Sequence, residues 1–425
     1  MRIDRRELLR QFGVTAAASV LLTSVVEPAC ASAEGTDIVA KLDSNENAYG
    51  PSEKAKEAFQ QAAGAVNRYP EKEIEKLCEA IASAHGVAPK NITLGCGSTE
   101  LLRMAAEACL APGRSLVMAT PTFPSIATAA KLAGAEVRNV PLTHEYAHDL
   151  PAMVAQTDAK TGIFYVCNPN NPTGTLTPRG TLETLLPKIS AETFVVMDEA
   201  YHDYVSPSGA YGSWAKRAAT DPRMIVTRTF SKVYGLAGLR VGYAVSSEGT
   251  AKQLKARQLP GSINAVAARV ALAALGDTAH VKRIAQLNSN DRQEFFNQAN
   301  ARMLRCLDSE TNFVLMRTFV SGKETAEMLR GKGVLVRAEY LGFEKHIRVS
   351  LGLPEEMRAF WSTWDAMMPH HPMWNQVESI NNIRNECTVA ARQLGGSSVC
   401  YTSDVQAQRN TVNNEAEQKP TGRLA

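Results

Sequence analysis

Short apolar runs alternate with segments of helical periodicity through the middle of the chain. From about residue 92 onward, runs rich in β-branched and apolar residues include NITLG, SLVMAT, GIFYVCNP, TFVVMDEA and MIVTRTF. Segments with apolar residues at helical spacing, such as STELLRMAAEACL and GTLETLLPKIS, separate most of these runs. Strands that alternate with helices predict an α/β domain with a mostly parallel sheet. Because several runs are apolar throughout, we expect helices to cover both faces of that sheet.

The pattern changes on both sides of this region and divides the chain into segments. Residues 34–60 are polar at first and helical afterwards, and we expect them to form an N-terminal arm that joins a small domain. The large domain is expected over residues 61–260. Helical segments followed by the β-like runs NFVLMRTF, VLVRAEY and HIRVSLG predict a smaller α+β domain over residues 261–370. Residues 371–425 are rich in Asn, Gln, Ser and Gly, so we expect a largely disordered tail.

The first 33 residues predict an export signal. Arg5 and Arg6 precede the apolar run FGVTAAASVLLTSVV and the small-residue stretch ACASA, which is the order found in cleaved signal peptides. The paired arginines are typical of a twin-arginine signal, which would deliver the protein to the Tat export machinery and place it in the periplasm. An amphipathic helix that stays on a cytoplasmic protein is the alternative. The apolar run is shorter than the ~20 residues of a membrane span, so we expect no stable membrane insertion.

Composition excludes several function classes. The chain has 425 residues, of which 44% are hydrophobic and 21% charged, as in a globular enzyme of about two domains. The formal net charge of +3 leaves no basic footprint for nucleic acid. The eight cysteines form no C-x-x-C pair and no metal-ligand spacing, so we predict no metal site.

Two loops that contain glycine and asparagine follow apolar runs. GCGSTELL, Gly95 to Leu102, comes after NITL and opens a helix, so its backbone could cradle a phosphate or form an ordinary capped turn. CNPNNPTG carries Asn171, whose amide can donate and accept hydrogen bonds, although a simple turn is the alternative. The CNPNNPTG loop follows the end of an apolar run, and open α/β sheets bind ligands at the carboxyl ends of their strands.

Two later motifs carry ionisable side chains. VVMDEAYHDY ends an apolar run with Asp198, which could bind a cation, act as a base, pair with a cationic ring nitrogen or cap the next helix. TFSKVYGLAGLRVG places Lys232 in an apolar, glycine-rich stretch, where the lysine either lies on a surface loop or acts as a nucleophile. A phosphate cradle, a strand-end aspartate and a reactive lysine together match the requirements of pyridoxal 5′-phosphate.

In this order the motifs resemble the fold-type I pyridoxal-phosphate aminotransferases, and among them the histidinol-phosphate aminotransferase family. The resemblance runs from about residue 40 to about residue 368 and rests on SNENAYGPS, NRYPE, GCGSTE, PTFPSI, NPNNPTG, DEAY, TFSKVYGLAGLRVG and IRVSLG. It implies a large domain with a seven-stranded, mostly parallel sheet flanked by helices, and a smaller α+β domain. It also implies a homodimer with shared active sites.

The resemblance further implies how the chain would use the cofactor. Lys232 would bind the cofactor aldehyde and then act as general base and acid in the proton shift. Asp198 would keep the ring nitrogen protonated, while Asn171 and Tyr201 would hydrogen-bond the phenolic oxygen. Phe123 would stack on the ring, at a position where relatives often have tyrosine.

The phosphate and the substrate would be held by further matching residues. The phosphate ligands implied within one chain are Gly97, Ser98, Thr99, Thr229, Ser231 and Arg240. Tyr69 would reach the phosphate of the other subunit. Arg348 would bind the substrate α-carboxylate as a two-pronged fork. Tyr49 and Arg337 match positions near the distal end of the substrate, which favours an anionic side chain, although both could be inherited scaffold.

The expected reaction is ping-pong transfer of an amino group between a donor such as histidinol phosphate and 2-oxoglutarate. The alternatives are an aromatic amino-acid aminotransferase, a pyridoxal-phosphate-dependent amino-acid phosphate decarboxylase, and an inactive exported binding protein. The segment QLPGSINAVA departs from the FNVN-like stretch of the family, and export would remove the enzyme from cytoplasmic histidine synthesis. Retention of Lys232, Asp198 and Arg348 argues against an inactive protein.

Overall fold

The computed structural model describes residues 37–206 and 210–367. The predicted export signal, residues 1–33, and the predicted tail, residues 371–425, lie outside the described residues. Within the described ranges, no helix combines the length and the apolar character needed to cross a membrane.

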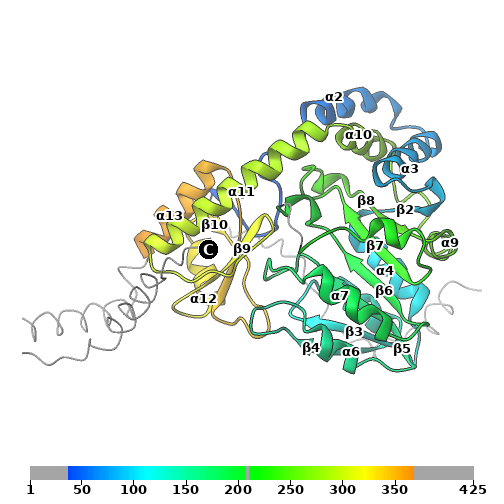
Figure 1. Ribbon diagram of the computed structural model, residues 1–425. Coiled ribbons are helices and arrows are strands. Elements are labelled where there is room, and N and C mark those ends of the chain that lie inside the picture. The colour runs from blue at the N-terminus through cyan, green and yellow to red at the C-terminus, as the bar shows by residue number, and fades with distance from the viewer. Residues whose placement is uncertain (1–36, 207–209, 368–425) are drawn as a thin grey trace, which may run out of the picture.

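A seven-stranded sheet forms the centre of the larger part of the molecule (Figure 1). Its strands, in spatial order, are β2 (Ile92–Gly95), β8 (Gly242–Ser246), β7 (Met224–Thr229), β6 (Phe194–Asp198), β5 (Thr161–Cys167), β3 (Ser115–Thr120) and β4 (Glu136–Pro141). Neighbouring strands are parallel except where β8 pairs with β2 and β7. The predicted mostly parallel, seven-stranded sheet is therefore confirmed.

Successive residues of each strand point to opposite faces of the sheet, and each face has its own apolar core. On one face Leu116, Ile163 and Val196 belong to a single buried cluster. The helices that supply residues to this cluster are α4 (Gly97–Cys109), α5 (Ser125–Leu132) and α9 (Glu248–Lys255).

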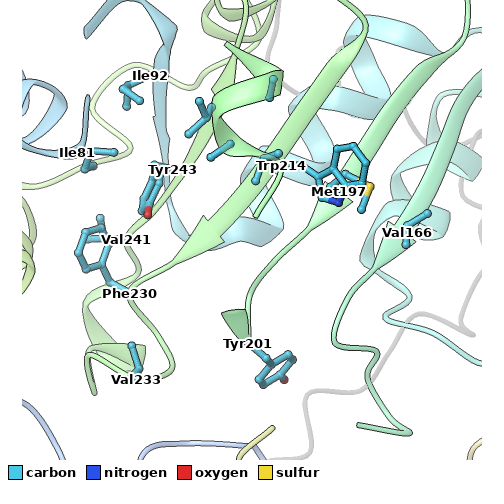
Figure 2. Packing of buried hydrophobic residues seen from close by; sticks show 14 of the residues in the cluster. Ile81, Ile92, Val166, Met197, Tyr201, Trp214, Phe230, Val233, Val241 and Tyr243 are labelled. Atoms are coloured by element: carbon cyan, nitrogen blue, oxygen red, sulfur yellow. The ribbon is translucent and has the colours of Figure 1, made fainter. Parts of the chain in front are cut away.

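The opposite face is covered by a larger set of helices. Figure 2 shows Val166, Met197 and Trp214 of this second core, in which strand residues meet the helices. The helices that contribute buried residues are α2 (Glu53–Ala62), α3 (Glu71–His85), α6 (Leu150–Ala155), α7 (Arg179–Leu185), α8 (Ala215–Ala218) and α10 (Ala265–Leu275). Helices on both faces explain why the strand runs are apolar throughout.

A smaller unit with a separate core is built around two short sheets. Strand β9 (Phe313–Arg317) pairs antiparallel with β11 (His346–Ser350), and β1 (Ala40–Lys41) pairs parallel with β10 (Val334–Leu335). Helices α12 (Gly322–Arg330) and α13 (Pro354–Met367) pack on them.

The long helix α11 (Thr278–Ala301) connects the two cores (Figure 1). Its Ile284 belongs to the core beside the large sheet, whereas its Phe295 belongs to the core of the smaller unit. Helix α10 also lies in the large-sheet core, although the predicted boundary at residue 260 assigned it to the small domain. The packing thus favours a division of the two domains within α11.

Candidate active site

A cavity of about 720 Å³ opens at the carboxyl ends of the parallel strands and reaches the smaller unit. Strands β3, β5, β6 and β7 all end at this edge of the sheet, so loops distant in sequence meet there. The predicted site residues that line the cavity are Ser98, Thr99, Phe123, Asn171, Asp198, Tyr201, Thr229, Ser231, Lys232, Arg240, Arg337 and Arg348. Gly97, Tyr49 and Tyr69 are not among the lining residues.

Lys232 follows β7 on a glycine-rich loop and points its amine at the N-terminal arm. Its Nζ donates to the backbone carbonyl oxygen of Asn45 at 2.9 Å and to that of Ser44 at 3.3 Å. Burial, and secondly the nearby positive charge of Arg348, lowers the pKa of Lys232 to about 7. A neutral amine is the form that attacks an aldehyde, so this environment suits a nucleophilic lysine.

Asp198 is the last residue of β6 and lies 1% exposed beneath the cavity. The Tyr165 hydroxyl donates to Asp198 Oδ2 at 3.0 Å, and the Thr227 hydroxyl donates to Oδ1 at 3.2 Å. The backbone N–H of Ala200 donates to Oδ1 at 3.3 Å. Burial raises the pKa of Asp198 to about 6 despite these hydrogen bonds. A cationic partner in the cavity would favour the ionised carboxylate, which is the requirement for holding a protonated ring nitrogen.

The start of helix α4 and the Arg240 side chain form an anion cradle. Gly97 begins α4 with a φ of +73°, and a Cβ built at this residue would lie 2.5 Å from Arg240 Nη2. A larger residue here would strain the backbone and push the guanidinium aside. Arg240 Nη1 donates to Ser231 Oγ at 3.3 Å, and Ser98 and Thr99 line the cavity at the helix N-terminus. Exposed helix N–H groups beside a guanidinium suit a phosphate.

Asn171 and Tyr201 lie on the loops after β5 and β6. Asn171 Oδ1 accepts a hydrogen bond from Arg348 Nη1 at 2.7 Å. The Tyr201 hydroxyl accepts a hydrogen bond from Asn45 Nδ2 at 3.0 Å. Burial raises the pKa of Tyr201, which keeps its hydroxyl protonated. These contacts bring both predicted partners of a phenolic oxygen to the cavity wall, together with the ring of Phe123.

Two arginines of the smaller unit face the same cavity. Arg348 and Arg337 form an antiparallel backbone bridge, which places directly opposed side chains on one face. Arg348 Nη2 donates to the backbone carbonyl oxygen of Asp43 at 2.7 Å, while its buried Nε has no hydrogen-bond partner among the described residues. Each Nη atom carries a second N–H besides the one in these hydrogen bonds, so the guanidinium still has donors for a carboxylate.

Two predicted residues lie elsewhere. The Tyr49 hydroxyl donates to Asp291 Oδ2 on α11 at 2.9 Å, so Tyr49 is turned to that helix and not to the cavity of its own chain. Tyr69 is 83% exposed and lies outside the cavity of its own chain.

Sequence reasoning missed the residues that support the site from behind. Tyr165 lies in the apolar run GIFYVCNP, which predicts a buried strand. Because the hydroxyl of a buried tyrosine usually forms a hydrogen bond, its presence in that run could have indicated a polar partner. Asn45 lies within the motif SNENAYGPS, but no role for Asn45 was predicted from the sequence. Its backbone adopts a φ of 53° and its side chain is buried, which the sequence alone could not show.

The fold and the site agree with the requirements of pyridoxal phosphate. A lysine with a lowered pKa, a buried strand-end carboxylate and an anion cradle converge on one cavity. The described residues contain no group of three or more side chains that could hold a metal ion.

Comparisons with known proteins agree with this assignment. The aminotransferase class I and II family matches residues 37–360. Histidinol-phosphate aminotransferase of Moorella thermoacetica is 38% identical over 77% of this chain and 84% of its own length. Histidinol-phosphate aminotransferase 1 of Cupriavidus pinatubonensis is 40% identical over 76% and 86%. The crystal structure of histidinol-phosphate aminotransferase from Sinorhizobium meliloti in complex with pyridoxal-5′-phosphate covers 76% of this chain and 89% of its own, with a TM-score of 0.72 and 28% identity. The chain belongs to the class I and II aminotransferases and is a pyridoxal-phosphate-dependent enzyme of that family.

Proposed function

We propose that this aminotransferase acts on amino donors with an anionic distal group, of which histidinol phosphate is the first candidate, and uses 2-oxoglutarate as acceptor. The observation that carries this proposal is the pair Arg337 and Arg348, which are bridged through their backbones and line one cavity. Two guanidinium groups suit the phosphate of histidinol phosphate and the carboxylates of 2-oxoglutarate. The names of the relatives above support the same donor.

When bound, pyridoxal phosphate supplies an electron sink for the negative charge left on carbon when a bond to it breaks. The residues of this chain would bind and orient the cofactor and transfer the proton. The amine of Lys232 would hold the cofactor and then move a proton, and the carboxylate of Asp198 would hold the ring nitrogen. The anion cradle of Gly97 and Arg240 holds the phosphate with Ser98, Thr99, Thr229 and Ser231.

The substrate is oriented by the smaller unit. The planar guanidinium of Arg348 is already held by Asn171 and by the backbone of Asp43, so little side-chain freedom is lost when a carboxylate binds. An anionic group bound at this point, either the phosphate of histidinol phosphate or a carboxylate of 2-oxoglutarate, would orient the substrate in the cavity that Lys232 also lines.

An absorbance experiment tests the proposed donor. The cofactor-loaded protein should lose its visible absorbance when histidinol phosphate is added and recover it when 2-oxoglutarate follows. Loss of the band with phenylalanine or tyrosine but not with histidinol phosphate would support the aromatic alternative. With a phosphorylated amino acid such as O-phosphothreonine in place of histidinol phosphate, a band that persists while carbon dioxide is released would support the decarboxylase alternative.

We also propose a homodimer with shared sites. Tyr69 is 83% exposed in the single chain, and the family resemblance directs it to the partner's phosphate. A mixture of the inactive variants Lys232→Ala and Tyr69→Ala should regain about a quarter of the wild-type activity, because half of the dimers would hold one complete site. No recovery after the subunits exchange would count against shared sites.

Export to the periplasm stays a prediction from residues 1–33. Fractionation of cells that make the full chain tests it, with a variant that carries Arg5→Lys and Arg6→Lys as the control. We expect the wild-type protein in the periplasm and the variant in the cytoplasm. Equal cytoplasmic retention of both proteins would favour the amphipathic-helix alternative.

A further inference from the structure

Asn45 connects the tyrosine of the site to the smaller unit through a short chain of hydrogen bonds. Its side chain is 1% exposed and its backbone has a φ of 53°. Asn45 Nδ2 donates to the Tyr201 hydroxyl at 3.0 Å. On its other side, Asn45 contacts Ser350, which lies on β11 two residues after Arg348.

The contacts with Ser350 determine which way the Asn45 amide points. The backbone N–H of Asn45 donates to Ser350 Oγ at 2.8 Å, because an N–H can only donate. Ser350 Oγ in turn donates to Asn45 Oδ1 at 3.1 Å, and among the described residues the Ser350 hydroxyl has no other acceptor. A flipped amide would leave that hydroxyl hydrogen without an acceptor, so Oδ1 faces Ser350 and Nδ2 faces Tyr201.

The direction of these bonds passes on to Tyr201. The Tyr201 oxygen accepts a hydrogen bond from Asn45, so the hydroxyl hydrogen of Tyr201 cannot point toward Asn45. That hydrogen is therefore available to an acceptor in the cavity that Tyr201 lines. Among the described residues, the Tyr201 hydroxyl has no second hydrogen-bond partner. Burial raises the pKa of Tyr201, so the hydroxyl keeps this hydrogen at working pH.

We propose that Asn45 is a positioning residue that makes Tyr201 a hydrogen-bond donor to the cofactor's phenolic oxygen. The inference rests on the proposed cofactor role of Tyr201. It assigns to the N-terminal arm a part in setting the charge distribution of the bound cofactor. Ser350 is part of the same hydrogen-bond chain because it orients the amide of Asn45.

The readout is the pH midpoint at which the lysine-bound cofactor changes its visible absorbance. A hydrogen bond donated to the phenolic oxygen stabilises its negative charge and so lowers this midpoint. Asn45→Asp offers only acceptors to Tyr201 when ionised, so it should turn the tyrosine hydrogen away from the cavity. We expect the midpoint to rise by about one to two pH units, as for the loss of one hydrogen bond to a charged oxygen.

A double-mutant cycle separates this effect from the added negative charge. Besides the substituted residue, the charged and titratable groups around Tyr201 are Arg348, Asp198, Cys167 and Lys232, and all variants retain them. In a Tyr201→Phe background, Asn45→Asp should shift the midpoint by less than half as much, because only the charge remains. Asn47→Asp is the matched control: its side chain donates to the Val233 carbonyl and it should shift both backgrounds equally.

Asn45→Ala provides a second, uncharged test. It removes the donor but leaves Tyr201 free to donate, so the midpoint should move by only a few tenths of a pH unit. Equal shifts for Asn45→Asp in both backgrounds, or a larger shift for Asn45→Ala than for Asn45→Asp, would overturn the inference. A wild-type protein that gains no visible absorbance with pyridoxal phosphate would instead refute the proposed function.

Discussion

Lys232→Met should make the cofactor-free protein more stable near neutral pH, and this gain should disappear at high pH. The pKa of Lys232 falls from 10.5 to about 7 in the folded chain, chiefly because burial disfavours the ammonium form. Between these two values the unfolded chain binds more protons than the native chain. The free energy of unfolding of the wild-type protein therefore rises with pH across that window. Below about pH 7 the native state is destabilised by the full free-energy cost of burying the ammonium group.

The size of the effect follows from the shift of the pKa. A lowering from 10.5 to about 7 corresponds to at most about 5 kcal/mol, and about 4 kcal/mol of this lies between about pH 6 and about pH 10. Methionine has similar length and no charge, so it avoids the cost at every pH. It also loses the hydrogen bonds to the carbonyl oxygens of Ser44 and Asn45, which lowers its stability at both pH values.

Denaturant unfolding of the two cofactor-free proteins at equal concentration measures this difference. The advantage of Lys232→Met over the wild-type protein should shrink by several kcal/mol between about pH 6 and about pH 10. Lys188→Met, at an exposed lysine, is the control and should show a constant difference from wild type. An advantage of Lys232→Met that stays the same at both pH values would refute the claim that burial lowers the pKa of this amine.

Four further changes test the site. Lys232→Ala should abolish both turnover and the visible absorbance, and an active, yellow variant would contradict the assignment of the lysine. Gly97→Ala should weaken cofactor binding at least about tenfold in a titration, because its Cβ would displace Arg240 and its φ is +73°. Asp198→Ala should keep the fold, as seen by circular dichroism, and lower turnover by at least about 100-fold; near-normal turnover would mean another partner for the ring nitrogen. Deletion of residues 371–425 should leave activity intact, and loss of folding would show that the tail contributes to the structure.

The sheet and most of the site could be predicted because their signals are local in sequence. Each buried parallel strand is a short apolar run, and the chemical motifs follow directly where β5, β6 and β7 end. Strand ends meet at one edge of a parallel sheet, so the order of motifs along the chain was sufficient to bring Asp198 and Lys232 together.

The contacts that sequence reasoning did not predict join distant segments of the chain. Helix α10, AVAARVALAAL, is apolar on nearly every side, so its periodicity does not indicate which core it joins. Tyr49 meets Asp291 and Asn45 meets Ser350, across 242 and 305 residues respectively. No local pattern specifies such pairs, because they form only when the arm packs on the smaller unit through β1 and β10.

The way in which the cavity holds its cations explains why the arm matters for function. Arg240 and Arg348 form no ion pair with any carboxylate of the described residues. Instead, the backbone carbonyl oxygen of Ala237 accepts a hydrogen bond from Arg240, and that of Asp43, in the N-terminal arm, accepts one from Arg348. Carbonyl dipoles orient a cation without cancelling its charge, so the cavity keeps a positive potential for a phosphate and a carboxylate. A carboxylate in place of these carbonyls would hold the side chains equally well but would compete with the ligands for the same charges. The arm thus fixes the geometry of the site while leaving its charge available.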